Sequence, residues 1–245
     1  MKRNFKLIIS YDGTRFSGWE RKDGRDTVQG KMEDVLEKMA VEPVKLIAAG
    51  RTDAGVHAEG MCANVHIDTR MTEKEIRDYL NRYLPGSIAV TEVRECSERF
   101  HARYNAIGKT YRYTCFAGEV RPVFDRRYVT VLDFSPDVEK MRSAAQVLVG
   151  EHDFMAFCGN THFKKSAVRN VDTIDITEEG GYIRFTLHGN GFLQNMVRII
   201  VGTLLEVGRG KLTAGDVSEI LASRVRKNAG PTAPPQGLCL MSVDY

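Results

Sequence analysis

The sequence of 245 residues lacks the long hydrophobic run that a membrane-spanning helix would need. No apolar stretch free of charged residues approaches the roughly 18 residues that mark such a helix. The N-terminus starts with basic residues, but its apolar run before Asp12 has only the length of a strand and is too short for a secretory signal peptide. These absences predict a globular protein of the cytoplasm with no membrane partner.

Cysteine is scarce, and no two cysteines lie close together along the chain. The five are Cys62, Cys96, Cys115, Cys158 and Cys239. An odd number without close pairs argues against a disulfide framework and against a zinc site. The histidines also lack the paired spacing of metal ligands. We therefore expect reduced cysteines that mostly pack in the interior, and no bound metal.

The excess of positive charge is small, since the formal net charge is only +3. Total charge alone therefore does not predict a nucleic-acid partner. Basic residues do alternate with aromatic rings in the segments 99–104, 109–113 and 162–165. Such segments suit single-stranded or looped RNA, because cations contact phosphates and rings stack on unpaired bases. One segment alone is typical of a solvated strand edge, but several together favour nucleic acid.

Apolar residues in the first hundred positions alternate between strand spacing and helix spacing. The expected elements are a strand from Phe5 to Tyr11, a helix over 28–40, strands over 44–49 and 61–67, a helix after Thr72 and a strand over 88–93. Thr72 and Glu75 have the spacing of a capping box, and Pro85 follows the helix as a stop signal. The predicted order is strand, helix, strand, strand, helix, strand.

The second half of the sequence repeats this order. The expected elements are a strand within 102–116, a helix from Ser135-Pro136 that Gly150 ends, strands near 171–177 and 182–188, a helix over 192–207, a short helix from Thr213 and a strand over 237–244. We predict an α+β protein with two ferredoxin-like halves, residues 1–100 and 101–245. They would form a mixed, mainly antiparallel sheet with helices on one face. A central cleft is expected to hold the catalytic site.

The loop between the second and third expected strands contains Arg51, Thr52, Asp53 and His57, with glycines at 50 and 55. Glycine adopts backbone angles that other residues avoid and lets a ligand approach closely. Two interpretations fit this loop. In one, Asp53 hydrogen-bonds neighbouring backbone amides in a tight turn, which is common for Asp beside Gly. In the other, the loop binds a ligand.

The long helix over 192–207 is apolar nearly all round, but it carries Arg198 near its middle. An arginine in such a helix either extends along the surface to reach water or pairs with a fixed carboxylate. The planar guanidinium suits the second task. Asp53 is the natural candidate for that carboxylate.

Seven segments, in the same order along the chain, resemble the tRNA pseudouridine synthase A (TruA) family from end to end. They are YDGTRFSGWE at 11–20, GRTDAGVHA at 50–58, FHAR at 100–103, KTYRY at 109–113, GEHDFMAF at 150–157, NGFLQNMVRIIVGTLLEVG at 190–208 and GLCLMSVDY at 237–245. The resemblance implies an isomerase that converts uridine to pseudouridine in the anticodon stem-loop of tRNA, at positions 38, 39 and 40. It also implies a homodimer that uses no cofactor.

The same resemblance assigns roles to individual residues. It implies that Asp53 is the catalytic carboxylate and that Arg198 pairs with it. The Tyr111 ring would stack on the flipped uracil, Arg51 would help to fill or hold the space that the base leaves, and Leu238 would pack near the base. Asp53 could attack the sugar, attack the base or remove a sugar proton, and the sequence does not choose among these routes.

His101, Arg103 and Lys109 are expected to bind the RNA substrate as well, since they lie in the basic and aromatic segments. Three other functions are weighed against this reading. A paralogue of the family would act on other uridines or another RNA, and a non-catalytic RNA-binding module would tolerate the loss of Asp53. A metal-dependent nucleic-acid hydrolase would use Asp53 with nearby histidines, and a chelator would abolish its activity.

Overall fold

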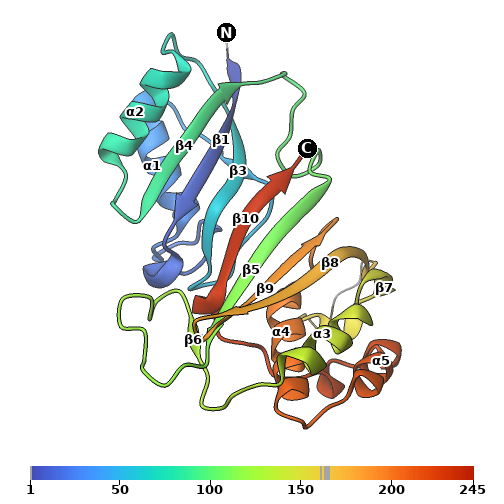
Figure 1. The fold of residues 1–245 in the computed structure, drawn as a ribbon. Helices are drawn as coiled ribbons and strands as arrows, with labels where there is room; N and C mark the ends of the chain where they lie inside the picture. Colours follow the sequence, from blue (N-terminus) through green and yellow to red (C-terminus); the bar gives the residue numbers. More distant parts are fainter. Residues whose placement is uncertain (1, 161, 163–165) are drawn as a thin grey trace. The chain divides into compact units, whose positions relative to one another are not determined.

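Two compact units of the chain, each with strands and helices, are present in the computed structural model (Figure 1). The structure describes residues 2–160, 162 and 166–245. The first unit contains the residues up to Ile107 together with Cys239–Tyr245, and the second contains Gly108–Leu238. Two lysines of a predicted basic segment, Lys164 and Lys165, lie outside the described residues.

The first unit is built on a sheet in which β1 lies between β3 and β4, antiparallel to both. Its elements are β1 (Arg3–Tyr11), α1 (Val28–Ala40), β2 (Ile47–Ala48), β3 (His57–Ile67), α2 (Glu73–Tyr83), β4 (Ile88–Glu95) and the last strand, β10 (Leu238–Asp244). β2 pairs with β3 in antiparallel fashion, and β10 runs parallel to β3 with Cys239 opposite His57. Figure 1 shows α1 and α2 side by side on one face. The strand and helix order expected for the first hundred residues is confirmed.

Alternation along β1 explains the two faces of this sheet. Phe5, Leu7 and Ile9 are fully buried, as are their partners on β3. On the opposite face, Asn64 donates from Nδ2 to Asn4 Oδ1 at 3.0 Å. The same two side chains bind the chain after β4, because Asn4 Nδ2 donates to the Phe100 carbonyl at 2.9 Å and Asn64 Oδ1 accepts from the Ala102 amide at 2.8 Å. A polar pair thus anchors the FHAR segment.

The capping box predicted at Thr72 is confirmed. The Thr72 hydroxyl accepts from the Glu75 amide at 3.3 Å, and the Glu75 carboxylate accepts from the Thr72 amide at 2.7 Å. These hydrogen bonds from Thr72 to the charged carboxylate lower the pKa of Glu75. The helix ends at Tyr83, just before Pro85, as the stop signal indicates.

The second unit has an antiparallel sheet in the order β5-β9-β8-β7, with the short β6 parallel to β5. Its elements are β5 (Gly108–Phe116), β6 (Thr130–Val131), α3 (Val138–Gln146), β7 (Gly150–Asp153), β8 (Val168–Glu179), β9 (Tyr182–Gly189), α4 (Met196–Gly208) and α5 (Ala214–Ser223). The three helices gather on one side of it (Figure 1). Both units therefore combine α-helices with mostly antiparallel strands, as the sequence predicts.

Several predicted boundaries in the second half are wrong. The first helix starts at Val138, because Asp137 rather than Ser135 caps it by accepting from the Lys140 amide at 3.0 Å. The same helix ends at Gln146, and Gly150 instead opens β7 with a φ of +106°. The expected helix from Phe192 begins only at Met196. Asn195 has a φ of +59°, which no α-helical residue adopts.

α4 meets the chain before β10 by close backbone contact. A Cβ atom added at Gly202 would lie 1.8 Å from the Pro231 carbonyl oxygen, and one at Gly230 would lie 2.7 Å from Thr203 Cα. The Gly230 amide also donates to the Thr203 hydroxyl at 2.9 Å. The two segments approach as closely as they do because neither glycine carries a side chain.

Gly202→Ala should therefore have an effect on stability opposite to the usual one. Alanine in place of glycine inside a helix normally stabilises it by about 0.8–1 kcal/mol. Here we expect a loss of about 1–3 kcal/mol, because the new methyl group meets backbone that has little freedom to move. Gly215→Ala in α5 is the matched control, since its Cβ would make only an ordinary contact with Thr213 Oγ1 at 3.5 Å. Urea unfolding that shows equal gains for both variants would contradict the close contact.

Candidate active site

The loop that carries Asp53 connects β2 to β3 and closes as a turn. The Val56 amide donates to the Asp53 carbonyl at 3.2 Å, and Gly55 has a φ of +79°. Thr52 is buried, whereas Asp53 is half-buried. The left-handed position explains why glycine stands at 55. The turn interpretation of this loop is thus correct for its backbone, and it leaves the Asp53 side chain partly accessible.

The segment Tyr11–Trp19 supports this turn from the side. The Tyr11 hydroxyl lies 2.7 Å from the Thr52 hydroxyl, and the Trp19 amide donates to the Thr52 carbonyl at 3.1 Å. Beyond Asp53, the Gly55 amide donates to the Phe16 carbonyl at 3.3 Å. Hydrogen bonds from one segment therefore hold the backbone on both sides of Asp53.

Two glycines make this support possible. A Cβ atom at Gly13 would lie 1.9 Å from the Val56 carbonyl oxygen. One at Gly18 would lie 2.8 Å from the Thr52 carbonyl oxygen, and Gly18 also has a φ of +97°. Any larger residue at either position would displace the turn, so the glycines of the YDGTRFSGW stretch belong to the architecture of the site.

Arg51 is exposed and forms an ion pair with Glu20, with 2.5 Å between its Nη2 and Glu20 Oε1. The Arg51 side chain retains 65% of its solvent exposure. Exposed ion pairs of this kind contribute little to stability, so the pair serves mainly to direct the guanidinium. The sequence analysis did not predict Glu20 as its partner, because the contact depends on how Tyr11–Trp19 folds around the turn.

His101 and Arg103 lie at the surface of the first unit, on the segment that Asn4 and Asn64 anchor. The His101 ring stacks on the exposed ring of Tyr104 at 4.2 Å between centroids. His101 Nδ1 accepts from the backbone amides of Arg103 and Tyr104, both at 3.2 Å. Arg103 is exposed and has no ion-pair partner among the described residues. The structure therefore presents a cation beside stacked rings.

Tyr111 lies on β5 of the second unit, two residues after Lys109, and both are half-buried. The Tyr111 ring meets Phe192 edge to face, with centroids 5.3 Å apart. Tyr113, on the same face of β5, is fully buried, and its hydroxyl donates to the Pro234 carbonyl at 2.8 Å. Burial raises the pKa of Tyr113, so its phenol stays neutral. Tyr113 has a structural role, whereas Tyr111 is only half-buried.

Leu238 is buried at the start of β10. The residue before it, Gly237, lies against the ring of Tyr113, where a Cβ atom would come within 2.6 Å of the ring. This contact fixes the path of the chain as it enters the strand. The GLCLM sequence therefore needs its glycine for packing.

Arg198 is fixed by acceptors close to it in the fold. Its Nε donates to the Ala233 carbonyl at 2.7 Å, and its Nη1 donates to Asn195 Oδ1 at 3.0 Å. Asn195 has a left-handed backbone, and its side chain points to Arg198 instead of capping α4. Asparagine is one of the few residues that adopt this conformation readily. The sequence analysis missed Asn195, although an Asn directly before an apolar helix was an available signal.

The predicted site residues are divided between the units. The first unit carries Arg51, Asp53, His101 and Arg103, and the second carries Lys109, Tyr111, Arg198 and Leu238. The described residues contain no group of three or more His, Cys, Asp or Glu side chains arranged to hold a metal ion. Among those same residues, no helix has the length and apolar character needed to cross a membrane.

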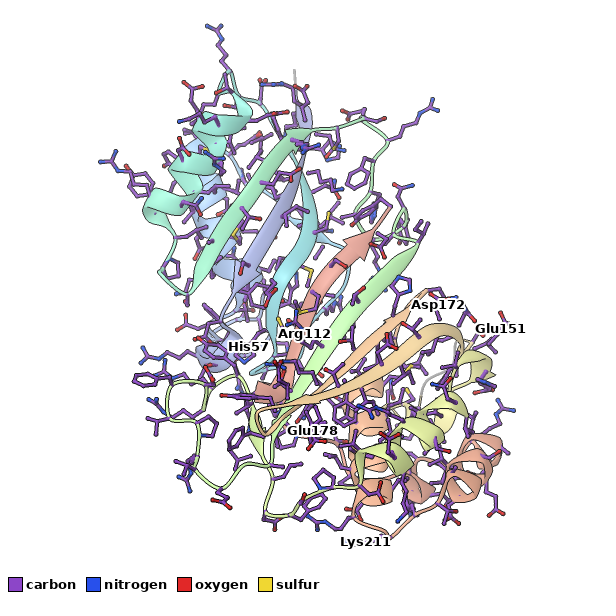
Figure 2. The ribbon with its side chains drawn as sticks, viewed as in Figure 1. His57, Arg112, Glu151, Asp172, Glu178 and Lys211 are labelled. Atoms are coloured by element: carbon purple, nitrogen blue, oxygen red, sulfur yellow. The ribbon has the colours of Figure 1, made fainter. Side chains whose placement is uncertain are left out.

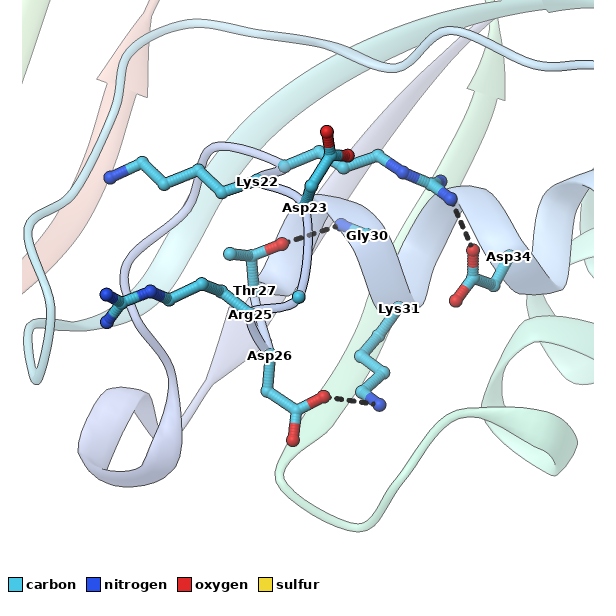
Figure 3. Close-up of a pocket in the computed structure, with 10 residues that line it drawn as sticks. Lys22, Asp23, Arg25, Asp26, Thr27, Gly30, Lys31 and Asp34 are labelled. Atoms are coloured by element: carbon cyan, nitrogen blue, oxygen red, sulfur yellow. Dashed lines mark hydrogen bonds and ion pairs between the residues drawn. The ribbon is translucent and has the colours of Figure 1, made fainter.

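A pocket of about 440 Å³ lies elsewhere in the first unit, between residues 21–27 and the start of α1 (Figure 3). Two ion pairs cross it, Lys31 with Asp26 at 2.8 Å and Arg21 with Asp34 at 3.0 Å. Charges of both signs line this pocket, and none of the predicted site residues does. It is therefore separate from the candidate active site.

Comparison with known proteins finds relatives that match almost the whole chain. The family model described as tRNA pseudouridine synthase matches residues 7–105 and 144–245. The tRNA pseudouridine synthase A 2 of Bacillus cereus is 44% identical over 99% of each chain, and the tRNA pseudouridine synthase A of Geobacter sp. is 45% identical over 99% of each chain. These matches define an isomerase that modifies RNA. The chain belongs to the tRNA pseudouridine synthase A (TruA) family.

Proposed function

We propose that this protein converts uridine to pseudouridine in the anticodon stem-loop of tRNA, at positions 38, 39 and 40. The reaction breaks the bond between ribose C1′ and uracil N1, turns the base and joins C1′ to C5. The C5 proton leaves and N1 gains a proton, so the product is an isomer and no cofactor is required. The observation that carries the proposal is the turn at Asp53, whose backbone is held on both sides by Tyr11–Trp19.

Asp53 is the proposed catalytic carboxylate, as nucleophile at the sugar or the base or as the base that removes a sugar proton. Arg198 is proposed as its ion-pair partner. Acceptors at Ala233 and Asn195 already engage Nε and Nη1 of Arg198, which fixes the plane of the guanidinium. The planar guanidinium carries five N–H donors in a fixed fork, a geometry that suits a carboxylate. These two hydrogen bonds support a positioned rather than a mobile cation.

The target uridine must leave its stack before it can react. We propose that the accessible part of Tyr111 stacks on the flipped uracil, that Leu238 packs near the base, and that Arg51 fills or holds the vacated space. His101, Arg103 and Lys109 are proposed to bind the RNA. The exposed Arg103 beside the stacked rings of His101 and Tyr104 supports this assignment.

We further propose that the chain forms two ferredoxin-like halves, residues 1–100 and 101–245, with the catalytic cleft in the middle, and that it acts as a homodimer in the cytoplasm. The neighbour order β4-β1-β3-β2 in the first unit supports the ferredoxin-like description of the first half. The dimer rests on the family resemblance, and sedimentation of the purified protein tests it.

An assay on an unmodified tRNA transcript tests the proposed activity. The transcript carries tritium at C5 of uridine, and conversion to pseudouridine releases that tritium to water. We expect release that stops when the uridines at positions 38, 39 and 40 are replaced by cytidine. Unchanged release from the transcript with cytidine at these positions would show that the protein modifies other uridines. No release from either transcript, with binding intact, would favour a non-catalytic RNA-binding module.

Substitution of Tyr111 should separate stacking from proton transfer. Stacking of a base on an aromatic ring contributes about 1–3 kcal/mol, so Tyr111→Leu should lower the rate constant of conversion by roughly 5- to 150-fold. Tyr111→Phe keeps the ring and its contact with Phe192, and we expect a rate close to wild type. Single-turnover kinetics with bound tRNA measure both variants. If Phe is as damaging as Leu, the hydroxyl and not the ring is the important group.

A further inference from the structure

His57 is a buried histidine for which the proposed reaction has no role. It is the first residue of β3, four positions after Asp53 (Figure 2), and only 5% of it is exposed. Its Nδ1 accepts from the Gly13 amide at 3.0 Å and lies 3.3 Å from Asp12 Oδ1. In the hydrogen bond from Gly13, the lone pair of Nδ1 is the acceptor.

The side chains of Asp12 and His57 accept hydrogen bonds from two backbone amides of the segment Tyr11–Trp19. Asp12 Oδ1 accepts from the Thr14 amide at 2.9 Å, while His57 accepts from the Gly13 amide, which is buried. A buried amide without an acceptor is costly, so removal of the His57 nitrogen would favour a rearrangement of Gly13. Gly13 lies against the Val56 carbonyl with no space for a Cβ atom. A movement of Gly13 would therefore be transmitted to the Asp53 turn.

A chain of hydrogen bonds leads from His57 back to the turn. Gly13 donates to His57, the Gly13 carbonyl accepts from the Phe16 amide at 2.9 Å, and the Phe16 carbonyl accepts from the Gly55 amide at 3.3 Å. The turn itself is closed by the hydrogen bond from Val56 to Asp53. The backbone from Gly55 to His57 closes these hydrogen bonds into a ring on the C-terminal side of Asp53.

We infer that His57 is a positioning residue for Asp53, acting through Gly13 and Phe16 on the turn. This inference rests on the proposed function, since it assigns His57 to the same reaction. Its chemical requirement is a hydrogen-bond acceptor at the place of Nδ1. A residue that only filled the volume of the imidazole would keep the packing of β3 but leave the Gly13 amide without an acceptor.

Three variants separate the acceptor from the volume. In His57→Asn, Oδ1 stands near the place of Nδ1 and accepts from Gly13. In His57→Gln the side-chain oxygen lies one bond further out, near the place of Nε2, and His57→Leu has no acceptor. His66→Leu, on the same strand but half-buried, is the control. The measurements are the single-turnover rate constant with bound tRNA, the Kd for tRNA, and amide exchange at Gly55 and Val56.

We expect His57→Leu and His57→Gln to lower the rate constant at least about 10-fold, because small misplacements of a catalytic group have effects of this size. Their Kd should stay within about twofold of wild type, and His57→Asn should restore most of the rate. Amide exchange at Gly55 should be faster in the Leu and Gln variants than in the Asn variant. If the Leu variant does not fold, the rate constants and the amide exchange of the Asn and Gln variants still test whether an acceptor at the place of Nδ1 is needed.

Equal rates and equal exchange for the Asn and Gln variants would overturn the inference, and His57 would then only fill space. A loss confined to Kd would also overturn it, since a positioning residue acts on the bound complex. Failure of the proposed function gives a different result. The wild-type protein itself would then release no tritium, while amide exchange at Gly55 would still report on the acceptor at His57.

Discussion

Asp53→Asn should abolish pseudouridine formation while the protein stays folded and tRNA binding stays close to wild type. Asparagine keeps the shape of the side chain but loses its charge and its ability to act as nucleophile or base. Removal of the group that carries the chemistry typically lowers the rate constant about 10⁴-fold or more. Tritium release under single-turnover conditions measures the rate, and filter binding measures the Kd for tRNA.

Asp23→Asn is the matched control for this experiment. Asp23 lies in the same unit, is exposed, and lines the separate pocket of Figure 3. The substitution Asp23→Asn also removes one negative charge, and it should leave the rate constant unchanged. If Asp53→Asn retained more than about 1% of the wild-type rate, the carboxylate would have only a supporting role and the proposed mechanism would be wrong.

Arg198→Met should remove activity and also lower stability through two separate effects. The first is the loss of donors to the Ala233 carbonyl and to Asn195. The second is the proposed loss of a partner for Asp53, which is worth about 3–5 kcal/mol in a fully buried pair and less where water enters. Arg198→Lys keeps the charge but lacks the planar fork, so we expect it to restore the activity only in part.

Urea unfolding of the four combinations of Asp53→Asn and Arg198→Met isolates the second effect. If the two residues interact, the double variant loses less free energy of unfolding than the sum of the losses in the two single variants. Arg226→Met is the control, because Arg226 also donates to backbone carbonyls of the segment before β10, at 3.0 Å to Gly230. The loss of stability in Arg226→Met should add to the loss in Asp53→Asn, with no interaction energy between the two. Additive losses for Arg198 as well would leave it a purely structural role.

Local patterns were sufficient to predict much of this fold. Alternating apolar residues indicated β1. In α2 and in α5, the two residues of the capping box are three positions apart, so each box forms without a distant partner. β6 and β7 were missed, because two and four residues are too few to show a period. The late start of α4 depends on Asn195, whose left-handed backbone serves Arg198 rather than the helix.

The candidate site, like the fold, could be predicted only where local sequence patterns determine it. The Asp53 turn could be located from its glycines and from the strands on either side of it. Its supports could not, because contacts such as Gly13 with Val56 and Glu20 with Arg51 join positions more than 30 residues apart. The reason for Gly202 also lies in a contact between separate segments, since the close approach of Pro231 excludes a side chain there.

The place of β10 has a consequence for how the protein is made. β10 follows the whole of the second unit along the chain and so leaves the ribosome after it, but it belongs to the sheet of the first unit, where Cys239 lies opposite His57. N-terminal domains commonly fold during synthesis, before the rest of the chain appears. Here the part of β3 that begins at His57, beside the Asp53 turn, lacks its partner strand until β10 emerges. A nascent chain that stops short of residue 239 therefore contains every catalytic residue proposed above and still lacks a complete catalytic half.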